Sequence, residues 1–143
     1  MKRLVAATAC LTLAVLGTFA ASVYADAVSD REATMKEVGK AYKAIAGMAK
    51  AGTFDQAEIN KNATLIATKL DLFKTLFPDG SEAGDKQASP AIWTDRAGFD
   101  AAQAAAHDAA AKLAATDAAG FPAAFKDLGA GCKACHTKFR LAD

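Results

Sequence analysis

Four segments of this chain place apolar residues three or four positions apart, and this spacing constrains the fold more than any other feature of the sequence. The segments cover residues 29–50, 55–77, 95–116 and 121–139. Gly52, Pro78 and Gly120 separate each segment from the next, because glycine and proline end helices. Each segment is therefore predicted to be one helix of about 20 residues.

The apolar stripes of these helices supply one shared core. The residues expected to point inward are Val28, Met35, Val38, Tyr42, Ile45 and Ala49; Ile59, Ala63, Ile66, Leu70, Phe73 and Phe77; Phe99, Ala102, Ala106, Ala109 and Leu113; and Phe125, Leu128, Cys132, Cys135 and Phe139. Ser29 or Asp30 offers an N-cap to the first helix, and Pro122 suits the first turn of the fourth. Connections are short apart from one loop over residues 78–94. We therefore expect an all-α, antiparallel up-down-up-down four-helix bundle.

The start of the chain has the three parts of a secretory signal peptide. A basic start precedes an apolar run over residues 4–21, and small residues follow it. We expect cleavage after Ala25, which makes residues 1–25 a signal peptide that carries Cys10 away with it. A membrane anchor is the alternative, but the run contains three threonines and lies at the lower length limit for a span.

The mature chain, residues 26–143, has 118 residues, which suits one domain with a single core. Removing Lys2 and Arg3 from the 17 basic residues leaves 15 against 16 acidic residues, a formal net charge of −1. This balance favours neither nucleic acid nor an anionic membrane surface as a partner. We expect an exported protein without stable membrane insertion after cleavage.

Both cysteines of the mature chain belong to a CxxCH motif formed by Cys132, Cys135 and His136. On a helix these residues share one face, because they lie three and four positions apart. Covalent haem attachment needs two thiols that each meet one vinyl group, with an imidazole beside the second thiol to bind the iron. The motif therefore predicts a c-type haem.

Three other uses of these residues fit less well. A thioredoxin-like redox pair needs a βαβ setting and a position near a helix start. A structural zinc site needs a fourth strong ligand, but the other histidine, His107, lies on a separate predicted helix. We expect the His107 side chain to be exposed or partly packed. A plain disulfide leaves His136 without a role.

The chain resembles the class II c-type cytochromes, whose best-known members are the cytochromes c-prime. The resemblance rests on the four helices, on residues 90–93 (PAIW) before the third helix, and on residues 131–136 (GCKACH) followed by Phe139 and Arg140. It implies a periplasmic protein, thioether attachment through the two motif cysteines, and the motif histidine as proximal iron ligand. Phe139 departs from the family, in which many members carry tyrosine.

The other side of the iron needs a residue level with His136. In an up-down-up-down bundle the first and fourth helices are antiparallel, so the start of one lies level with the end of the other. Met35, six residues after Ser29, has nearly the depth of His136, whereas Met48 lies about 20 Å further along the axis. Met35 is the candidate sixth ligand. The alternative is that it only fills core volume, as methionine often does.

The resemblance gives Met35 a family role. In cytochromes c-prime the position four residues after an arginine of the first helix is usually an apolar non-ligand, which leaves the iron five-coordinate and high-spin. Met35 follows Arg31 at that distance, which is similar to the low-spin, methionine-ligated, cytochrome c-556-like branch. Arg31 is a candidate partner of a haem propionate; a solvated arginine is the alternative. Lys133, Lys138 and Arg140 form a candidate basic rim for an acidic partner, or serve the helix dipole.

We therefore expect a periplasmic electron carrier, not an enzyme, with one covalent haem c and with His136 and Met35 as axial iron ligands. Its partners would be redox proteins. The alternatives are a five-coordinate, cytochrome c-prime-like binder of nitric oxide or carbon monoxide, and a haem-free thiol redox protein. An extra apolar row at Leu65, Leu72 and Leu76 is either a homodimer face or the flank of a wide core stripe.

Overall fold

The computed structural model of the chain describes residues 16–141, and for residues 16–25 it describes the backbone only. Residues 1–15, which hold most of the expected signal peptide, lie outside the described residues, so cleavage after Ala25 stays a prediction. No helix in the described part is long and apolar enough to cross a membrane.

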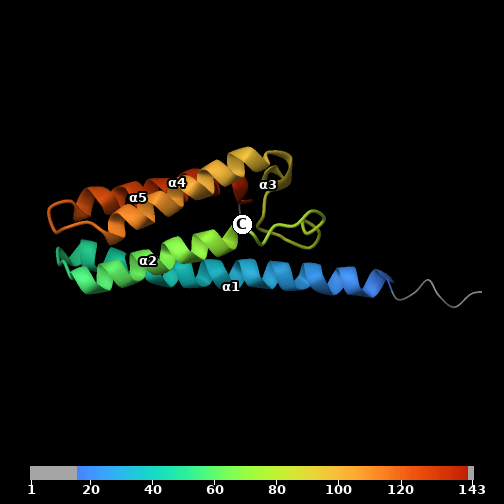
Figure 1. The fold of residues 1–143 in the computed structure, drawn as a ribbon, viewed down its shortest axis with the longest axis horizontal. Helices are drawn as coiled ribbons and strands as arrows, with labels where there is room; N and C mark the ends of the chain where they lie inside the picture. Colours follow the sequence, from blue (N-terminus) through green and yellow to red (C-terminus); the bar gives the residue numbers. More distant parts are fainter. Residues whose placement is uncertain (1–15, 142–143) are drawn as a thin grey trace, which may run out of the picture.

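Four long helices form the bundle that the periodicity predicts (Figure 1). They are α1 (Leu16–Ala51), α2 (Gln56–Phe73), α4 (Arg96–Ala114) and α5 (Phe121–Phe139), while α3 (Ala91–Thr94) is one short turn. The chain runs along α1, returns along α2, crosses through the loop that contains α3, and repeats the path with α4 and α5 (Figure 1). The α1–α2 pair therefore lies against the α4–α5 pair in an up-down-up-down arrangement.

Helix α1 begins earlier than the sequence pattern indicates. The pattern predicts a start near Ser29 with Ser29 or Asp30 as the N-cap, whereas the helix is continuous from Leu16. The N-cap prediction is wrong for the full chain, because the residues before Ser29 are also helical and leave no helix start at that point.

Helix α2 ends at Phe73, four residues before the predicted end at Phe77. The chain then turns toward α4, where the Arg96 guanidinium donates hydrogen bonds to the carbonyl oxygens of Lys74 at 2.9 Å and Phe77 at 3.2 Å. Phe77 is still buried, as its place on the stripe predicts, but it is buried from the loop rather than from the helix.

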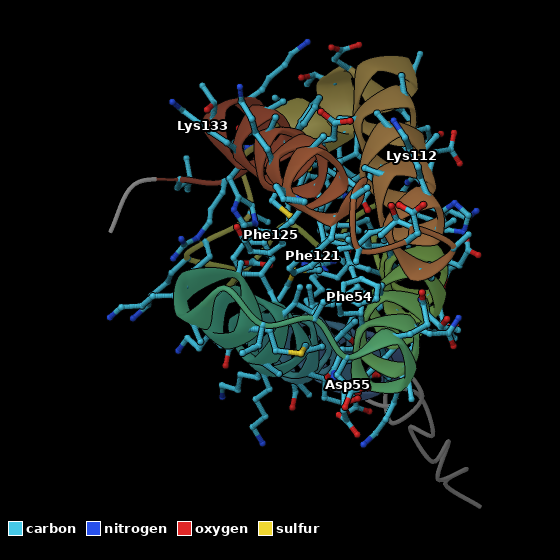
Figure 2. The ribbon with its side chains drawn as sticks, turned by 90° about the vertical axis from the view of Figure 1, so that its left-hand side faces the viewer. Phe54, Asp55, Lys112, Phe121, Phe125 and Lys133 are labelled. Carbon is cyan, nitrogen blue, oxygen red and sulfur yellow. The ribbon has the colours of Figure 1, made fainter. Side chains whose placement is uncertain are left out.

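The hydrophobic core consists of two clusters. The larger one joins all four long helices, and near the turns that join α1 to α2 and α4 to α5, Phe54, Phe121 and Phe125 point into the space between the helix pairs (Figure 2). The rings of Phe54 and Phe121 meet edge to face with centroids 5.7 Å apart. The smaller cluster lies beside the long loop and consists of Phe77, Ile92, Phe99, Cys135 and Phe139. This aromatic cluster surrounds one of the two motif cysteines.

The inward face of α4 agrees with the prediction at Phe99, Ala106 and Leu113, which are buried, and differs by one residue at the two positions between them. Gln103 and Ala110 are buried, whereas Ala102 and Ala109 are only half-buried. Alanine-rich helices give little contrast between neighbouring positions, so the apolar pattern does not fix which face turns inward.

Three of the four neighbouring helix pairs, α1–α2, α2–α4 and α4–α5, pack closely, whereas α1 and α5 make few direct contacts. Gly131 allows the close approach of α5 to α4, because a Cβ at this position would lie 3.2 Å from the Cα of Ala106. The bundle is therefore least closely packed on the side between α1 and α5.

Replacing Gly131 by valine should push α5 away from α4 and lower the free energy of unfolding by about 1–3 kcal/mol. Gly47→Val in α1 is the matched control, since a Cβ at Gly47 has nothing within 4 Å and valine is a slightly better helix former than glycine. Urea unfolding of both mature proteins, followed by circular dichroism, makes the comparison. Equal stability of the two variants would contradict a tight α4–α5 contact at Gly131.

Candidate functional site

A cavity of about 630 Å³ lies between α1 and α5, within the range of roughly 300–1,000 Å³ typical of ligand sites. The α1 wall includes Met35, Val38 and Tyr42, and the α5 wall includes Cys132, Cys135 and His136. Residues of α2, of the following turn and of α4 form the back wall, namely Leu70, Phe73, Phe77, Gln103 and Ala106. The cavity is therefore mostly apolar, with sulfur and imidazole groups on two facing helices.

The three motif side chains lie along the cavity, on one face of α5. Cys135 is buried, Cys132 is half-buried, and His136 is exposed. Both cysteines are free thiols. The predicted inward direction of the two cysteines is confirmed.

Burial raises the pKa of both thiols, and the pKa of Cys135 rises to about 11, with the nearby Cys132 adding to the shift. Both groups are therefore protonated at neutral pH. A thiol–disulfide redox site depends on a thiolate that is stabilised by a lowered pKa. The electrostatics of this site disfavour the thiol redox alternative.

The imidazole of His136 has the opposite tendency. Neighbouring atoms cover part of the ring, and this partial burial lowers the pKa of His136, with the positive charge of Arg140 as a second cause. The imidazole is therefore neutral at pH 7, which is the form that binds a metal.

Met35 is half-buried on α1 and lines the same cavity as His136. Met48, the other methionine of the described part, packs like Met35 against the larger core cluster, but it does not line the cavity. The structure thus brings Met35 and His136 to one cavity, as their matched depths predict, and leaves Met48 apart from it.

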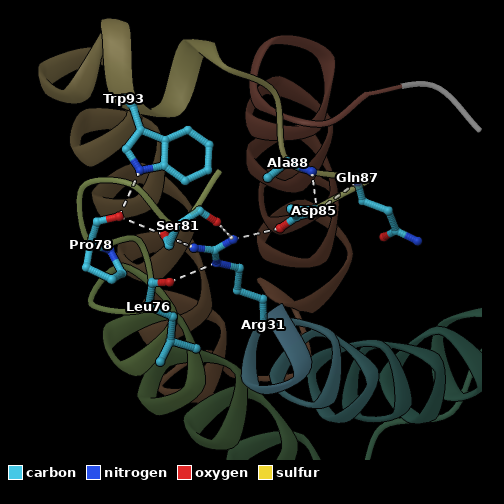
Figure 3. A network of polar contacts seen from close by, with 8 residues as sticks. All are labelled: Arg31, Leu76, Pro78, Ser81, Asp85, Gln87, Ala88 and Trp93. Atoms are coloured by element: carbon cyan, nitrogen blue, oxygen red, sulfur yellow. Dashed lines mark hydrogen bonds and ion pairs between the residues drawn. The ribbon is translucent and has the colours of Figure 1, made fainter. Parts of the chain in front are cut away.

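Arg31 lies in a buried polar network at the edge of the cavity (Figure 3). Its guanidinium donates to the carboxylate of Asp85 at 2.8 Å, to the carbonyl oxygen of Leu76 at 2.8 Å, and to the carbonyl and hydroxyl oxygens of Ser81. The side chain is only 4% exposed, so the solvated alternative is wrong. Sequence reasoning missed Asp85 and Ser81, because both occur among the turn residues of an ordinary polar loop.

The Asp85 side chain is itself only 7% exposed. Burial alone would raise its pKa, but hydrogen bonds from the amides of Ala88 and Gln87 and from Arg31 together lower it. Asp85 is therefore ionised at neutral pH, and it forms a buried ion pair with Arg31.

Gln103 is a cavity residue that sequence reasoning also missed. It is 3% exposed, its Nε2 lies 3.8 Å from the sulfur of Cys135, and its Oε1 has no hydrogen-bond partner among the described residues. A buried amide oxygen without a partner costs free energy, so such an atom suggests contact with a bound group. The apolar pattern gave no signal for Gln103, because the predicted inward stripe of this helix passes through Ala102 instead.

These residues fit a c-type haem. Two thiols and a neutral imidazole on one helix face are the groups that thioether attachment and iron ligation need. Apolar walls suit the macrocycle, and Gln103 supplies a polar contact beside Cys135. Within residues 26–141 no group of three or more His, Cys, Asp or Glu side chains is placed to hold a metal ion.

His107 lies outside the cavity on α4, where it is half-exposed. Its ring nitrogens lie 3.4 Å from a carboxylate oxygen of Asp71 and 3.0 Å from one of Asp108. The prediction of a partly packed surface histidine is confirmed.

The expected basic rim is only partly in place. Arg140 lines the cavity and Lys133 is exposed, but Lys138 forms an ion pair with Asp95. Helix α1 contributes two exposed lysines that line the cavity, Lys36 and Lys43, although Lys36 also lies 3.8 Å from a carboxylate oxygen of Glu32. The basic groups around the cavity therefore come from both helices.

Comparisons with known proteins place these observations in a family. The family model described as Cytochrome C' matches residues 26–140. The chain is 39% identical over 132 residues to a cytochrome c' of Rhodopseudomonas palustris, covering 90% of each chain. It is 42% identical over 127 residues to a cytochrome c-556 of Agrobacterium fabrum, covering 85% of this chain and 86% of that one. A solved nitric oxide complex of a mutant cytochrome c prime from Alcaligenes xylosoxidans aligns with a TM-score of 0.76 at 34% identity, covering 84% of this chain and 97% of that one.

Replacing Cys132 and Cys135 together by alanine should abolish covalent attachment of the cofactor, because no thiol remains on this face of α5. Either single variant retains one thioether position and serves as the intermediate control. Acid–acetone extraction and the intact mass of the purified protein measure attachment. Haem that stays with the double variant after extraction would show that other residues hold it.

Proposed function

The chain belongs to the cytochrome c-prime family, whose members carry covalently bound haem c, and we propose that it is a periplasmic electron-transfer protein with His136 and Met35 as axial iron ligands. One observation supports this proposal most: the His136 imidazole and the Met35 thioether line the same cavity from two facing helices. A relative named cytochrome c-556 is 42% identical, and the resemblance of Met35 to the methionine-ligated branch is a further reason for the proposal.

Four of the cavity residues have a defined part in the proposed site. Cys132 and Cys135 fix the cofactor to α5, and His136, one residue after the second attachment, approaches the iron from the same helix. Met35 approaches from α1. The haem supplies one-electron chemistry when bound, while the protein sets its ligands and surroundings. Iron held by both His136 and Met35 would offer no open position to a substrate, so we propose no catalytic side chain.

The second candidate function is binding of nitric oxide or carbon monoxide at a five-coordinate iron. Two observations favour it: several relatives are named cytochrome c', and a structurally similar cytochrome c prime has been solved as a nitric oxide complex. Methionine is also unbranched and adaptable, so Met35 is able to swing aside. The two candidates differ only in whether Met35 holds the iron.

We also propose a homodimer through the exposed face of α2. Leu65 and Leu72 are 37% and 46% exposed and lie two helical turns apart on one side of the helix. Leu76, the third residue of the predicted row, is half-buried against the smaller core cluster and lies beyond the end of α2. The resemblance to the cytochromes c-prime is the reason for proposing a second copy of the chain as the occupant of this narrow apolar row. Analytical ultracentrifugation of Leu65→Lys/Leu72→Lys tests it, and an unchanged sedimentation coefficient would refute it.

Met35→Leu is the variant that separates the two functions. The swap nearly conserves volume, so its cost in stability should be under about 1.5 kcal/mol. Loss of a thioether ligand should convert low-spin iron to five-coordinate high-spin iron, raise carbon monoxide affinity, and lower the reduction potential, because methionine ligation raises it. Visible absorption, carbon monoxide titration and potentiometry measure these changes.

Met48→Leu is the matched control, since Met48 packs against the same core cluster as Met35 but does not line the cavity. It should leave the spectrum and the potential unchanged. A Met35→Leu protein that stays low-spin at the wild-type potential would show that Met35 is core filler and that another group occupies the sixth position. A wild-type protein that is already high-spin would instead favour the second function.

The basic groups at the cavity should attract an acidic redox partner. On an electrode coated with a carboxylate-terminated monolayer, electron transfer to the wild-type protein should slow as ionic strength rises, because salt screens exposed charges. Lys36→Gln/Lys43→Gln should slow it several-fold at low salt. Lys61→Gln on α2, an exposed lysine that does not line the cavity, is the control. Equal rates for the two variants would refute docking through this side.

A further inference from the structure

The buried ion pair between Arg31 and Asp85 is a costly feature that stability alone does not explain. Both side chains are almost fully buried, and buried ion pairs contribute little compared with apolar residues of similar volume. Removing either partner, however, leaves an unpaired buried charge, so the two side chains must stay together. Such a pair is best suited to holding two segments in one position.

The Arg31 side of the pair fixes the turn of α1 that carries Met35. Arg31 lies one helical turn before Met35, so the two side chains point to the same side of α1. The guanidinium is held by hydrogen bonds to Leu76, Ser81 and Asp85. Its central carbon also lies 4.2 Å from the ring centroid of Phe77 and 5.4 Å from that of Trp93. Arg31 is therefore held on several sides by the segment that follows α2.

The Asp85 side of the pair leads toward α5. One carboxylate oxygen accepts the hydrogen bond from Arg31, and the other accepts from the backbone amides of Gln87 and Ala88, each at 2.8 Å (Figure 3). Gly84, with a φ of +86°, sets the turn just before Asp85. The carboxylate thus connects α1 to residues 87–88.

Residues 87–89 are in turn bonded to the end of α5. The carbonyl oxygen of Gln87 accepts from the amide of Leu141 at 2.8 Å, and the amide of Ser89 donates to the carbonyl oxygen of Phe139 at 3.0 Å. Phe139 lies three residues after His136. We name the segment of residues 76–89 the tethering loop, because it bonds the Met35 turn of α1 to the His136 turn of α5.

We propose that Arg31 and Asp85 are positioning residues that fix Met35 relative to His136 through the tethering loop and thereby favour methionine ligation. This inference rests on the proposed function. Helices α1 and α5 make few direct contacts. Their separation at the cavity therefore depends on the other segments that bond to both of them, and the tethering loop is one of these. Arg31 thus acts on the iron through Met35, and four of its five N–H groups are used in the tethering loop rather than for a haem propionate.

Asp85→Asn in the haem-bearing protein is the test, since it keeps the size of the side chain and removes the charge. We expect partial loss of Met35 from the iron, which is seen as a mixed-spin spectrum and a lower reduction potential. Carbon monoxide affinity of the reduced protein should rise about tenfold, because the ligand binds only the fraction in which Met35 is released. The backbone amides of Gln87, Ala88 and Leu141 should exchange hydrogen faster in the variant.

Asp100→Asn is the matched control, because it removes an exposed Arg–Asp pair, with Arg96 at 2.9 Å, elsewhere in the bundle. It should leave the spectrum, the potential and the three amides unchanged. Arg31→Leu/Asp85→Leu separates positioning from stability, because apolar replacement of a buried ion pair often preserves stability. We expect this double variant to be mixed-spin even where its unfolding midpoint equals that of the wild type.

The outcomes distinguish this inference from the proposed function. Wild-type protein that is low-spin through Met35, with Asp85→Asn and the double variant equally low-spin at unchanged carbon monoxide affinity, would overturn the inference and leave the function standing. Wild-type protein that is high-spin would overturn both the methionine ligation and its positioning. Unchanged exchange at Leu141 in Asp85→Asn would also overturn the inference, because the tethering loop would not carry the effect to α5.

Discussion

The separation of α1 from α5 is the constraint on which the rest of the structure depends. A four-helix bundle normally buries its apolar stripes by closing all of its sides, yet a flat cofactor that takes ligands from two facing helices requires one side to stay apart. The chain meets both demands by closing the other three sides tightly. Gly131 brings α5 against Ala106 of α4, and Phe54, Phe121 and Phe125 fill the end of the bundle at the short helix turns (Figure 2). The cavity is thus the result of good packing elsewhere.

Most of the bundle could be predicted from the sequence, because the spacing of apolar residues that marks an amphipathic helix lies within the helix itself. The spacing of Ile59, Ala63, Ile66 and Leu70 indicates one buried face, and those residues are buried. The sequence failed where the deciding partner is distant along the chain. Helix α2 ends early, and Arg96 of α4 donates hydrogen bonds to carbonyl oxygens just after its end. The residues near the end of α2 contain no pattern from which this distant contact could be predicted. On α4 two of the five inward positions were predicted one residue too early, at Ala102 and Ala109, because neighbouring alanines carry almost no directional signal.

The same division applies to the site. Cys132, Cys135 and His136 were predictable, since covalent attachment fixes their spacing within one helical turn, and Met35 was predictable as a cavity residue from its depth in an antiparallel bundle. Its role toward the iron stays a proposal. Gln103 and Asp85 were not predictable, because their importance comes from burial beside other elements rather than from a motif. Arg31 was recognised as a candidate, but its bonded neighbours are supplied by a loop whose composition resembles that of any polar turn.

Electron transfer and gas binding are proposed for the same scaffold. They would differ by a small free energy between the state in which Met35 binds the iron and the state in which it does not. Attachment to α5 and a neutral His136 suit both functions equally, so neither property selects one. What differs is the population of states in which the α1 side chain reaches the iron. A flexible methionine loses side-chain freedom when it binds, and a few kcal/mol are enough to change that population from minor to dominant. A preformed α1 turn, held by a buried ion pair and two aromatic rings, reduces this cost before the ligand is bound. Under the proposed positioning role, the loop beside the cavity, and not only the identity of residue 35, would decide which of the two functions this fold performs.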